Sequence, residues 1–166
     1  VNFFKSKNRK VSYDTLSNYL GYIEEAFLAY KTERYNIKGK DVVAGNCKYY
    51  LNDLSFKNFL YPGFAYGVGY LLENAVYLEL RRLGYIVYTG SFRDKEVDFV
   101  AMKDDRVIYL QATYMLETAQ TMEREYAPLL TIGDNYEKYV VSMDEVQFPS
   151  NEGVRHIQAW NLKEIL

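Results

Sequence analysis

The segment GVGYLLENAVYLELRRLG, residues 67–84, constrains the fold more than any other part of the chain. Apolar side chains recur in it at every third or fourth position, and Gly84 stands where a helix should end. The next segment, residues 85–92, is rich in β-branched and aromatic residues and predicts a strand. A helix with one apolar stripe must bury that stripe against a neighbouring layer, so we expect a sheet packed on this helix.

The segments after residue 92 continue the alternation of strands and helices. Residues 95–114 predict a β-hairpin, residues 118–132 a helix, residues 138–145 a strand, and residues 153–166 a strand that runs into a short helix. The order helix, three strands, helix, strand predicts an α/β fold with a mixed sheet flanked by helices.

The front of the chain predicts a smaller, separate unit. Its first helix is either interrupted at Gly21 or split there into two short helices. Two strands, residues 27–35 and 47–53, follow and are joined by a loop with glycines and lysines. Helix, turn, helix and a two-stranded wing are the elements of a winged helix, which binds DNA. We therefore predict a winged-helix-like domain at residues 1–60 and an α/β domain at residues 61–166.

Charge is divided unevenly between these two parts. Residues 1–60 carry ten Lys and Arg against six Asp and Glu, whereas residues 61–166 carry ten against sixteen. A basic front part is compatible with a polyanionic partner, so we predict DNA contacts there, with a solvated surface as the alternative. The cationic side chains expected to line the wing and to contact phosphates are Lys31, Arg34, Lys38 and Lys40.

Cysteine, histidine and hydropathy exclude several kinds of site. One cysteine and one histidine cannot build a zinc cluster. The apolar runs are too short for a transmembrane helix or a signal peptide, so we expect no membrane partner and a cytoplasmic location. The chain starts at Val1 without an initiator methionine and has no Walker phosphate loop, so we expect an upstream part to be missing.

The hairpin at residues 95–114 carries polar residues that a plain hairpin does not need. A two-residue turn at residues 104–105 would pair Lys103 with Arg106, and the register would then set Asp98 opposite Gln111. Because strand side chains alternate between faces, several polar groups should share one face. The residues expected together there are Glu96, Asp98, Gln111 and Thr113.

These side chains suit a hard cation such as Mg²⁺, which prefers oxygen ligands. The predicted ligands are Asp98, the side-chain carbonyl of Gln111 and the backbone carbonyl of Ala112, with Glu73 arriving from the helix packed behind. The alternatives are a polar cluster satisfied by its own hydrogen bonds and a hairpin face exposed to water.

Residues 71–116 and 121–145 resemble the C-terminal region of predicted bacterial and archaeal AAA-type ATPases, which is similar to the PD-(D/E)XK restriction-endonuclease-like fold. Residues 11–54 resemble the winged helix that those proteins carry before it. The resemblance implies a restriction-endonuclease-like sheet in residues 61–166 and an ATPase module upstream of Val1 as a partner. It also implies ATP binding only in that module, and the assembly could form homo-oligomers.

The resemblance assigns site residues position by position. Glu73 matches the helix glutamate of the nuclease family and Asp98 matches its strand aspartate, whereas Gln111, Ala112 and Thr113 stand where that family has Glu-x-Lys. Glutamine can still offer an oxygen to a metal but lacks the charge, and threonine lacks the cation that stabilises the transition state.

No other cation is expected to replace the lysine. Arg93 and Lys95 have the wrong strand parity, and Arg124 could equally pair with a glutamate on its own helix. We therefore expect a DNA-interacting or regulatory module with a degenerate, inactive nuclease-like site. The alternatives are a Mg²⁺-dependent DNA endonuclease with an atypical site, and a protein-interaction domain in which the eighteen tyrosines serve association.

Overall fold

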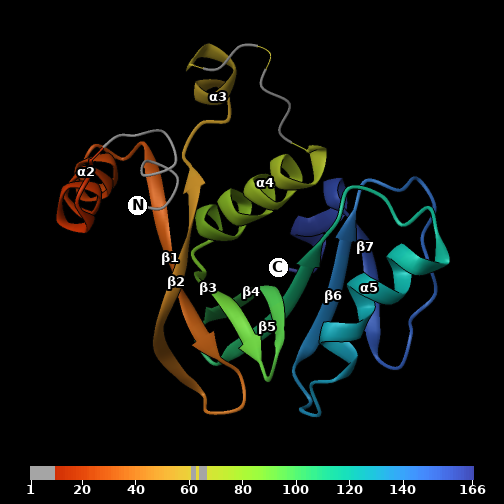
Figure 1. The fold of residues 1–166 in the computed structure, drawn as a ribbon. Helices are drawn as coiled ribbons and strands as arrows, with labels where there is room; N and C mark the ends of the chain where they lie inside the picture. Colours follow the sequence, from red (N-terminus) through yellow and green to blue (C-terminus); the bar gives the residue numbers. More distant parts are fainter. Residues whose placement is uncertain (1–9, 61–62, 64–66) are drawn as a thin grey trace.

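The computed structural model describes residues 10–60, 63 and 67–166, and its centre is one mixed seven-stranded sheet (Figure 1). The strand order is β2-β1-β3-β4-β5-β6-β7. The strands are β1 (Ala29–Asn36), β2 (Asp41–Leu51), β3 (Ile86–Phe92), β4 (Lys95–Lys103), β5 (Arg106–Ala112), β6 (Glu137–Ser142) and β7 (Val154–Gln158). The helices are α2 (Tyr13–Glu25), α3 (Ser55–Leu60), α4 (Val68–Arg82), α5 (Ala119–Leu130) and the 3₁₀ helix η1 (Ala159–Glu164). The prediction of an α/β fold with a mixed sheet and flanking helices is confirmed.

Helices α4 and α5 cover opposite faces of the sheet (Figure 1). Two consecutive residues of β5 show this. Leu110 packs in the core with Leu80 of α4, whereas Tyr109 packs in a second core with Leu129 of α5. Strands β3, β4 and β5 are antiparallel neighbours, and β6 and β7 continue parallel to β5. The apolar stripe predicted on α4 therefore faces the sheet, except that Val68 and Ala75 are exposed.

The predicted hairpin register is confirmed between the turn and Phe99, whereas the ladder does not extend to the predicted pair of Asp98 and Gln111. Lys103 pairs with Arg106 and Phe99 with Leu110 in the antiparallel β4–β5 ladder. Asp104 adopts a φ of 51°, the left-handed conformation that a two-residue hairpin turn requires.

A β-bulge at Asp98 was not predicted. In the β3–β4 ladder Tyr88 pairs with Val100 but Gly90 pairs with Val97, so two residues of β4 stand opposite one of β3. Val97 and Val100 both pack in the core under α5. They are three residues apart, so side chains do not alternate regularly between the two faces of the sheet across this part of β4. Gly90 is required opposite the bulge, because a Cβ there would lie 2.9 Å from a Val100 methyl group.

The two strands predicted as a wing lie in the same sheet as the rest of the fold. β1 and β2 form an antiparallel pair, and β1 also pairs in parallel with β3, from Arg34 opposite Thr89 to Asn36 opposite Ser91. Helix α2 runs through Gly21 without a break. The domain division between residues 60 and 61 stays a prediction, but strands from both sides of it share one hydrogen-bonded sheet.

No helix within the described part of the chain is long and apolar enough to cross a membrane.

Candidate functional site

Lys48 of β2 lies at the centre of an acidic cluster. Its ammonium nitrogen Nζ is 2.8 Å from Glu73 Oε1, 3.0 Å from Glu96 Oε1 and 3.3 Å from Asp98 Oδ1. No cation was expected to stand in for the missing lysine of the nuclease family, but the structure brings Lys48 to these carboxylates. The three carboxylates come from α4 and β4, so one lysine joins the edge strand of the sheet to its centre.

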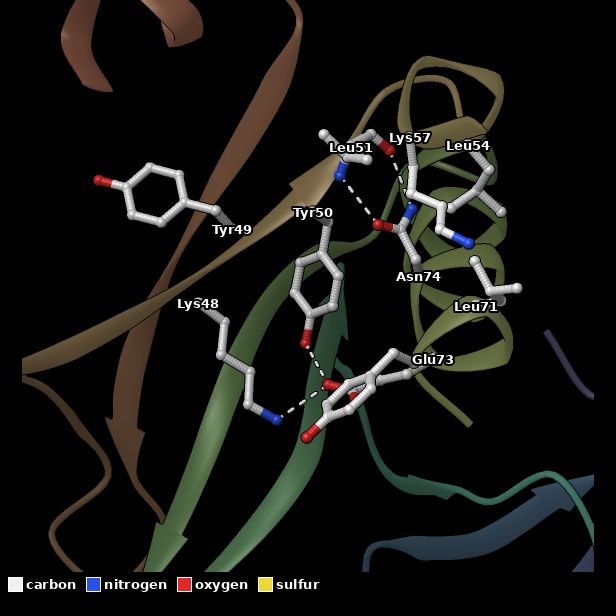
Figure 2. A pocket seen from close by; sticks show the side chains of 10 residues that line it. Lys48, Tyr49, Tyr50, Leu51, Leu54, Lys57, Leu71, Glu73 and Asn74 are labelled. Atoms are coloured by element: carbon white, nitrogen blue, oxygen red, sulfur yellow. Dashed lines mark hydrogen bonds and ion pairs between the residues drawn. The ribbon is translucent and has the colours of Figure 1, made fainter. Parts of the chain in front are cut away.

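Strand alternation and ring packing bring Lys48 to this place. Lys48 and Tyr50 are two residues apart on β2 and point to the same side, towards α4 (Figure 2). The Tyr50 ring stacks on Tyr77 of α4 with 4.2 Å between ring centres, and its hydroxyl donates to Glu73 Oε1 at 2.7 Å. Glu73 thus accepts hydrogen bonds from both Lys48 and Tyr50.

Asn74 of α4 fastens β2 beside the cluster. Its side-chain oxygen accepts from the Leu51 backbone N–H at 2.8 Å, and its side-chain nitrogen donates to the Leu51 carbonyl at 2.9 Å (Figure 2). β2 is an edge strand, and Asn74 satisfies backbone groups of Leu51 as a neighbouring strand would. Asn74 is therefore a positioning residue for Lys48, three residues earlier on the same strand.

Replacing Asn74 with alanine is expected to lower the free energy of unfolding by about 1–3 kcal/mol, because two backbone groups lose their partner. Amide exchange of Leu51 should become faster, as measured by hydrogen exchange and denaturant unfolding. Asn135→Ala, at an exposed loop residue, is the matched control. Unchanged exchange at Leu51 would contradict the positioning role.

Asp98 is held by the backbone as well as by Lys48. Its Oδ2 accepts from the Ala112 N–H at 2.9 Å, and its own N–H donates to Gln111 Oε1 at 3.3 Å. The bulge turns the Asp98 carboxylate towards α4, whereas the Gln111 amide donates to Glu125 Oε2 of α5 at 3.1 Å. Asp98 and Gln111 are adjacent, as predicted, but their side chains serve opposite faces of the sheet.

The inner part of the cluster holds surplus negative charge. Glu73 and Asp98 are both buried and share the single charge of Lys48. Burial and the neighbouring Glu73 raise the pKa of Asp98 to about 7, against the opposing effects of Lys48 and the Ala112 N–H. Burial alone would lower the pKa of Lys48, but the carboxylates of Asp98 and Glu73 outweigh burial and raise it. The lysine therefore stays charged, and the pair of carboxylates favours a further proton or cation.

Glu96 and Arg34 form the outer side of the cluster. The Arg34 guanidinium pairs with Glu96 Oε2, while Glu96 Oε1 faces Lys48. Arg34 was predicted to contact DNA, but it lies in this ion-pair network. The other predicted phosphate contacts, Lys31, Lys38 and Lys40, are exposed, and Lys40 lies over the ring of Tyr136.

The remaining residues of the predicted site lie outside the Lys48 cluster. Thr113 is buried just after β5, where its backbone N–H donates to the Val141 carbonyl. Arg124, once considered as a substitute cation, pairs with Glu125 of its own helix at 2.6 Å. Lys95 donates to a backbone carbonyl of α5.

Ser142, Asp144 and His156 form a second buried polar cluster. Its hydrogen bonds run in another direction than those of a catalytic triad, in which the histidine accepts from the serine hydroxyl. His156 Nδ1 accepts from the Phe148 N–H at 3.2 Å, so its Nε2 carries the proton and donates to Ser142 Oγ at 2.8 Å. The Ser142 hydroxyl then donates to Asp144 at 2.6 Å. A base cannot take a proton from a hydroxyl to which it is itself donating, so in this arrangement His156 does not activate Ser142 and the hydrogen bonds tie the loop before β7 to β6 and β7.

The Lys48 cluster offers few protein ligands to a metal ion. Among the described residues, no group of three or more His, Cys, Asp or Glu is arranged to hold a metal ion. Mg²⁺, however, is commonly bound by one or two carboxylates with water completing its shell. Glu73 and Asp98 provide two carboxylates, and in this structure the ammonium group of Lys48 lies within 3.3 Å of both.

Lys48 is the residue that sequence reasoning missed. Lys48 lies in a segment that was predicted as a strand, and its spacing of two from Tyr50 indicated that both side chains lie on the same face. Nothing in the spacing links it to Asp98, fifty positions later, because that contact depends on which strands are neighbours.

Comparisons with known proteins find similar sequences but no family. No protein-family model matches the chain, and no solved structure matches it significantly. An uncharacterized protein from Haemophilus influenzae is 36% identical over 141 residues, which cover 85% of this chain and 34% of that protein. Uncharacterized protein MJ1544 from Methanocaldococcus jannaschii is 32% identical over 129 residues, covering 75% of this chain and 28% of that protein. The chain thus spans about a third of the length of the curated relatives it matches.

Proposed function

We propose that the Lys48 cluster is the active site of a Mg²⁺-dependent nuclease. The observation that carries this proposal is the ammonium group of Lys48 within 3.3 Å of the carboxylates of Glu73, Glu96 and Asp98. A cation beside paired carboxylates is what the hydrolysis of a phosphodiester requires, because negative charge grows on the phosphoryl oxygens in the transition state. The lysine here comes from β2, instead of from the segment formed by β5, which carries Gln111, and by Thr113 just after it.

Each residue of the cluster has a role that follows from its contacts. Glu73 and Asp98 would hold Mg²⁺, which supplies a Lewis acid to the phosphate and to the attacking water. The Tyr50 hydroxyl and the Ala112 N–H keep these two carboxylates oriented. Lys48 directs its positive charge to the phosphoryl oxygens, where a preorganised cation needs no rearrangement during the reaction.

The reaction adds one water across the phosphodiester. A bond forms between the water oxygen and phosphorus, the bond from phosphorus to the departing sugar oxygen breaks, and a proton from the water ends on that oxygen. A site with surplus negative charge before the metal binds suits this chemistry, because bound Mg²⁺ and Lys48 then balance the charge of the carboxylates and the phosphate.

A second candidate function is a non-catalytic, DNA-interacting module. It is favoured by the way Lys48 already satisfies the carboxylates, as an internal counter-ion would, and by the Gln111 amide turning towards Glu125. In that case the exposed Lys38 and Lys40 would contact phosphates, and DNA binding would weaken as the salt concentration rises.

Incubation of the chain with labelled single-stranded and double-stranded DNA and with plasmid separates the two functions. We expect cleavage with Mg²⁺ or Mn²⁺, none with EDTA, and none by the Asp98→Asn variant under any of these conditions. If none of the substrates is cleaved while DNA binding is retained and Lys38→Ala and Lys40→Ala weaken it, the non-catalytic function is the correct one.

A further inference from the structure

A cavity of about 380 Å³ opens directly beside the Lys48 cluster (Figure 2). It lies between the end of β2, α3 with the segment leading into it, and the first half of α4. Lys48, Tyr50 and Glu73, which belong to the cluster, also line the cavity. A ligand in the cavity would therefore lie next to the groups that are proposed to act on a phosphate.

The walls of the cavity are mainly apolar and aromatic, with Lys57 of α3 as a further charged lining residue. Leu54 and Leu71 contribute aliphatic side chains, and Tyr70 contributes a ring that is 68% exposed to solvent. Asn74 also lines the cavity, but both polar atoms of its amide are engaged by Leu51. The charged groups proposed to act on the phosphate, Lys48 and Glu73, line the cavity on the side of the cluster, and the apolar side chains offer a flat, uncharged group a place to bind.

A nucleotide has this distribution of chemistry, with a flat base at one end and an anionic phosphate at the other. The volume is near the lower end of the range of about 300–1,000 Å³ typical of ligand pockets. Exposed aromatic rings bind unpaired bases by stacking, independently of base identity.

We propose that this cavity receives one unpaired nucleobase next to the scissile phosphate. The substrate of the site is then single-stranded or locally unpaired nucleic acid. This inference rests on the proposed nuclease function, which it deepens by naming the substrate class.

The test measures binding in EDTA, where cleavage cannot occur, by fluorescence anisotropy of labelled dT12, of the dT12·dA12 duplex and of rU12. We expect a single strand to bind at least about tenfold more tightly than the duplex, since only the single strand can insert a base. Leu54→Trp, which fills the cavity, and Tyr70→Ala, which removes the ring, should each weaken dT12 binding about tenfold. Tyr70→Phe should restore it, and Val146→Trp, at an exposed loop residue, is the control for adding a large ring.

The outcomes separate this inference from the proposed function. If the protein cleaves DNA but binds single strands and duplex equally, and Leu54→Trp behaves as the wild type, the cavity inference fails and the nuclease function stands. If dT12 binding responds to both cavity variants but no substrate is cleaved, the cavity binds bases and the nuclease function fails. Absence of dT12 and rU12 binding overturns the cavity inference.

Discussion

The Lys48→Met variant is expected to cleave DNA at least about a hundredfold more slowly than the wild type, because it loses a preorganised positive charge at the phosphoryl oxygens. Single-turnover cleavage of labelled DNA in saturating Mg²⁺ measures this loss. Lys163→Met, at an exposed lysine of η1, is the matched control and should cleave at the wild-type rate.

The same variant discriminates between the two candidate functions by the sign of its effect. If Lys48 were only an internal counter-ion, its removal would free Glu73 and Asp98 for metal, and Mg²⁺ affinity and any cleavage would rise. A rise in cleavage would therefore contradict a catalytic lysine. Calorimetric titration with Mg²⁺ provides the second readout.

Folding must be checked in this experiment, because removing Lys48 leaves two carboxylates without their cation. Breaking a fully buried ion pair costs about 3–5 kcal/mol, and the cost should be smaller here because the Lys48 side chain is 29% exposed. The double variant Lys48→Met/Asp98→Asn removes one of the two carboxylates as well and is expected to recover part of the loss. Denaturant unfolding of the three proteins measures this recovery.

The Asp98→Asn variant is expected to lose cleavage and Mg²⁺ binding together, because it removes the charge of one of two proposed metal ligands. The variant can still accept a hydrogen bond from the Ala112 N–H, so a loss of activity would not reflect a lost contact to β5. Mg²⁺ titration and the cleavage assay measure the two effects. Wild-type Mg²⁺ affinity in the variant would exclude Asp98 as a ligand.

Asp98→Asn should also change how stability depends on pH in the absence of metal. The pKa of Asp98 is about 7 in the folded protein and roughly 3.9 in an unfolded chain. Between these two values the folded protein keeps a proton that the unfolded chain releases, so this group makes the fold less stable as pH rises. Above about pH 7 its contribution stops changing.

The variant lacks this contribution. Its free energy of unfolding, minus that of the wild type, should therefore increase from about pH 4 to about pH 7 and then level off. Urea denaturation in EDTA across this range measures the difference. A difference that does not vary with pH would show that Asp98 does not titrate in the folded protein as stated.

Local sequence was enough for α4, for β3 and for the turn of the hairpin, but not for the unbroken α2, the start of β2 or α3. The periodicity of α4, the strand at residues 86–92 and the pairing of Lys103 with Arg106 depend on neighbouring residues and on one turn, and all three were predicted. The face that Asp98 presents was not, because the bulge arises from packing between Gly90 and the valines of β4. One extra residue in a strand moves every side chain beyond it to the opposite face from the one that simple alternation predicts.

The sequence by itself determined that this protein is an α/β fold with a mixed sheet, and that Glu73 and Asp98 are acidic residues on neighbouring elements. Only the tertiary structure decided which cation they meet. Lys48 reaches them because β2 and β1 join the sheet beside β3, and Asn74 and Tyr50 hold β2 against α4. Strand order is set by packing of the whole sheet, so no local pattern could connect Lys48 to a carboxylate fifty residues away.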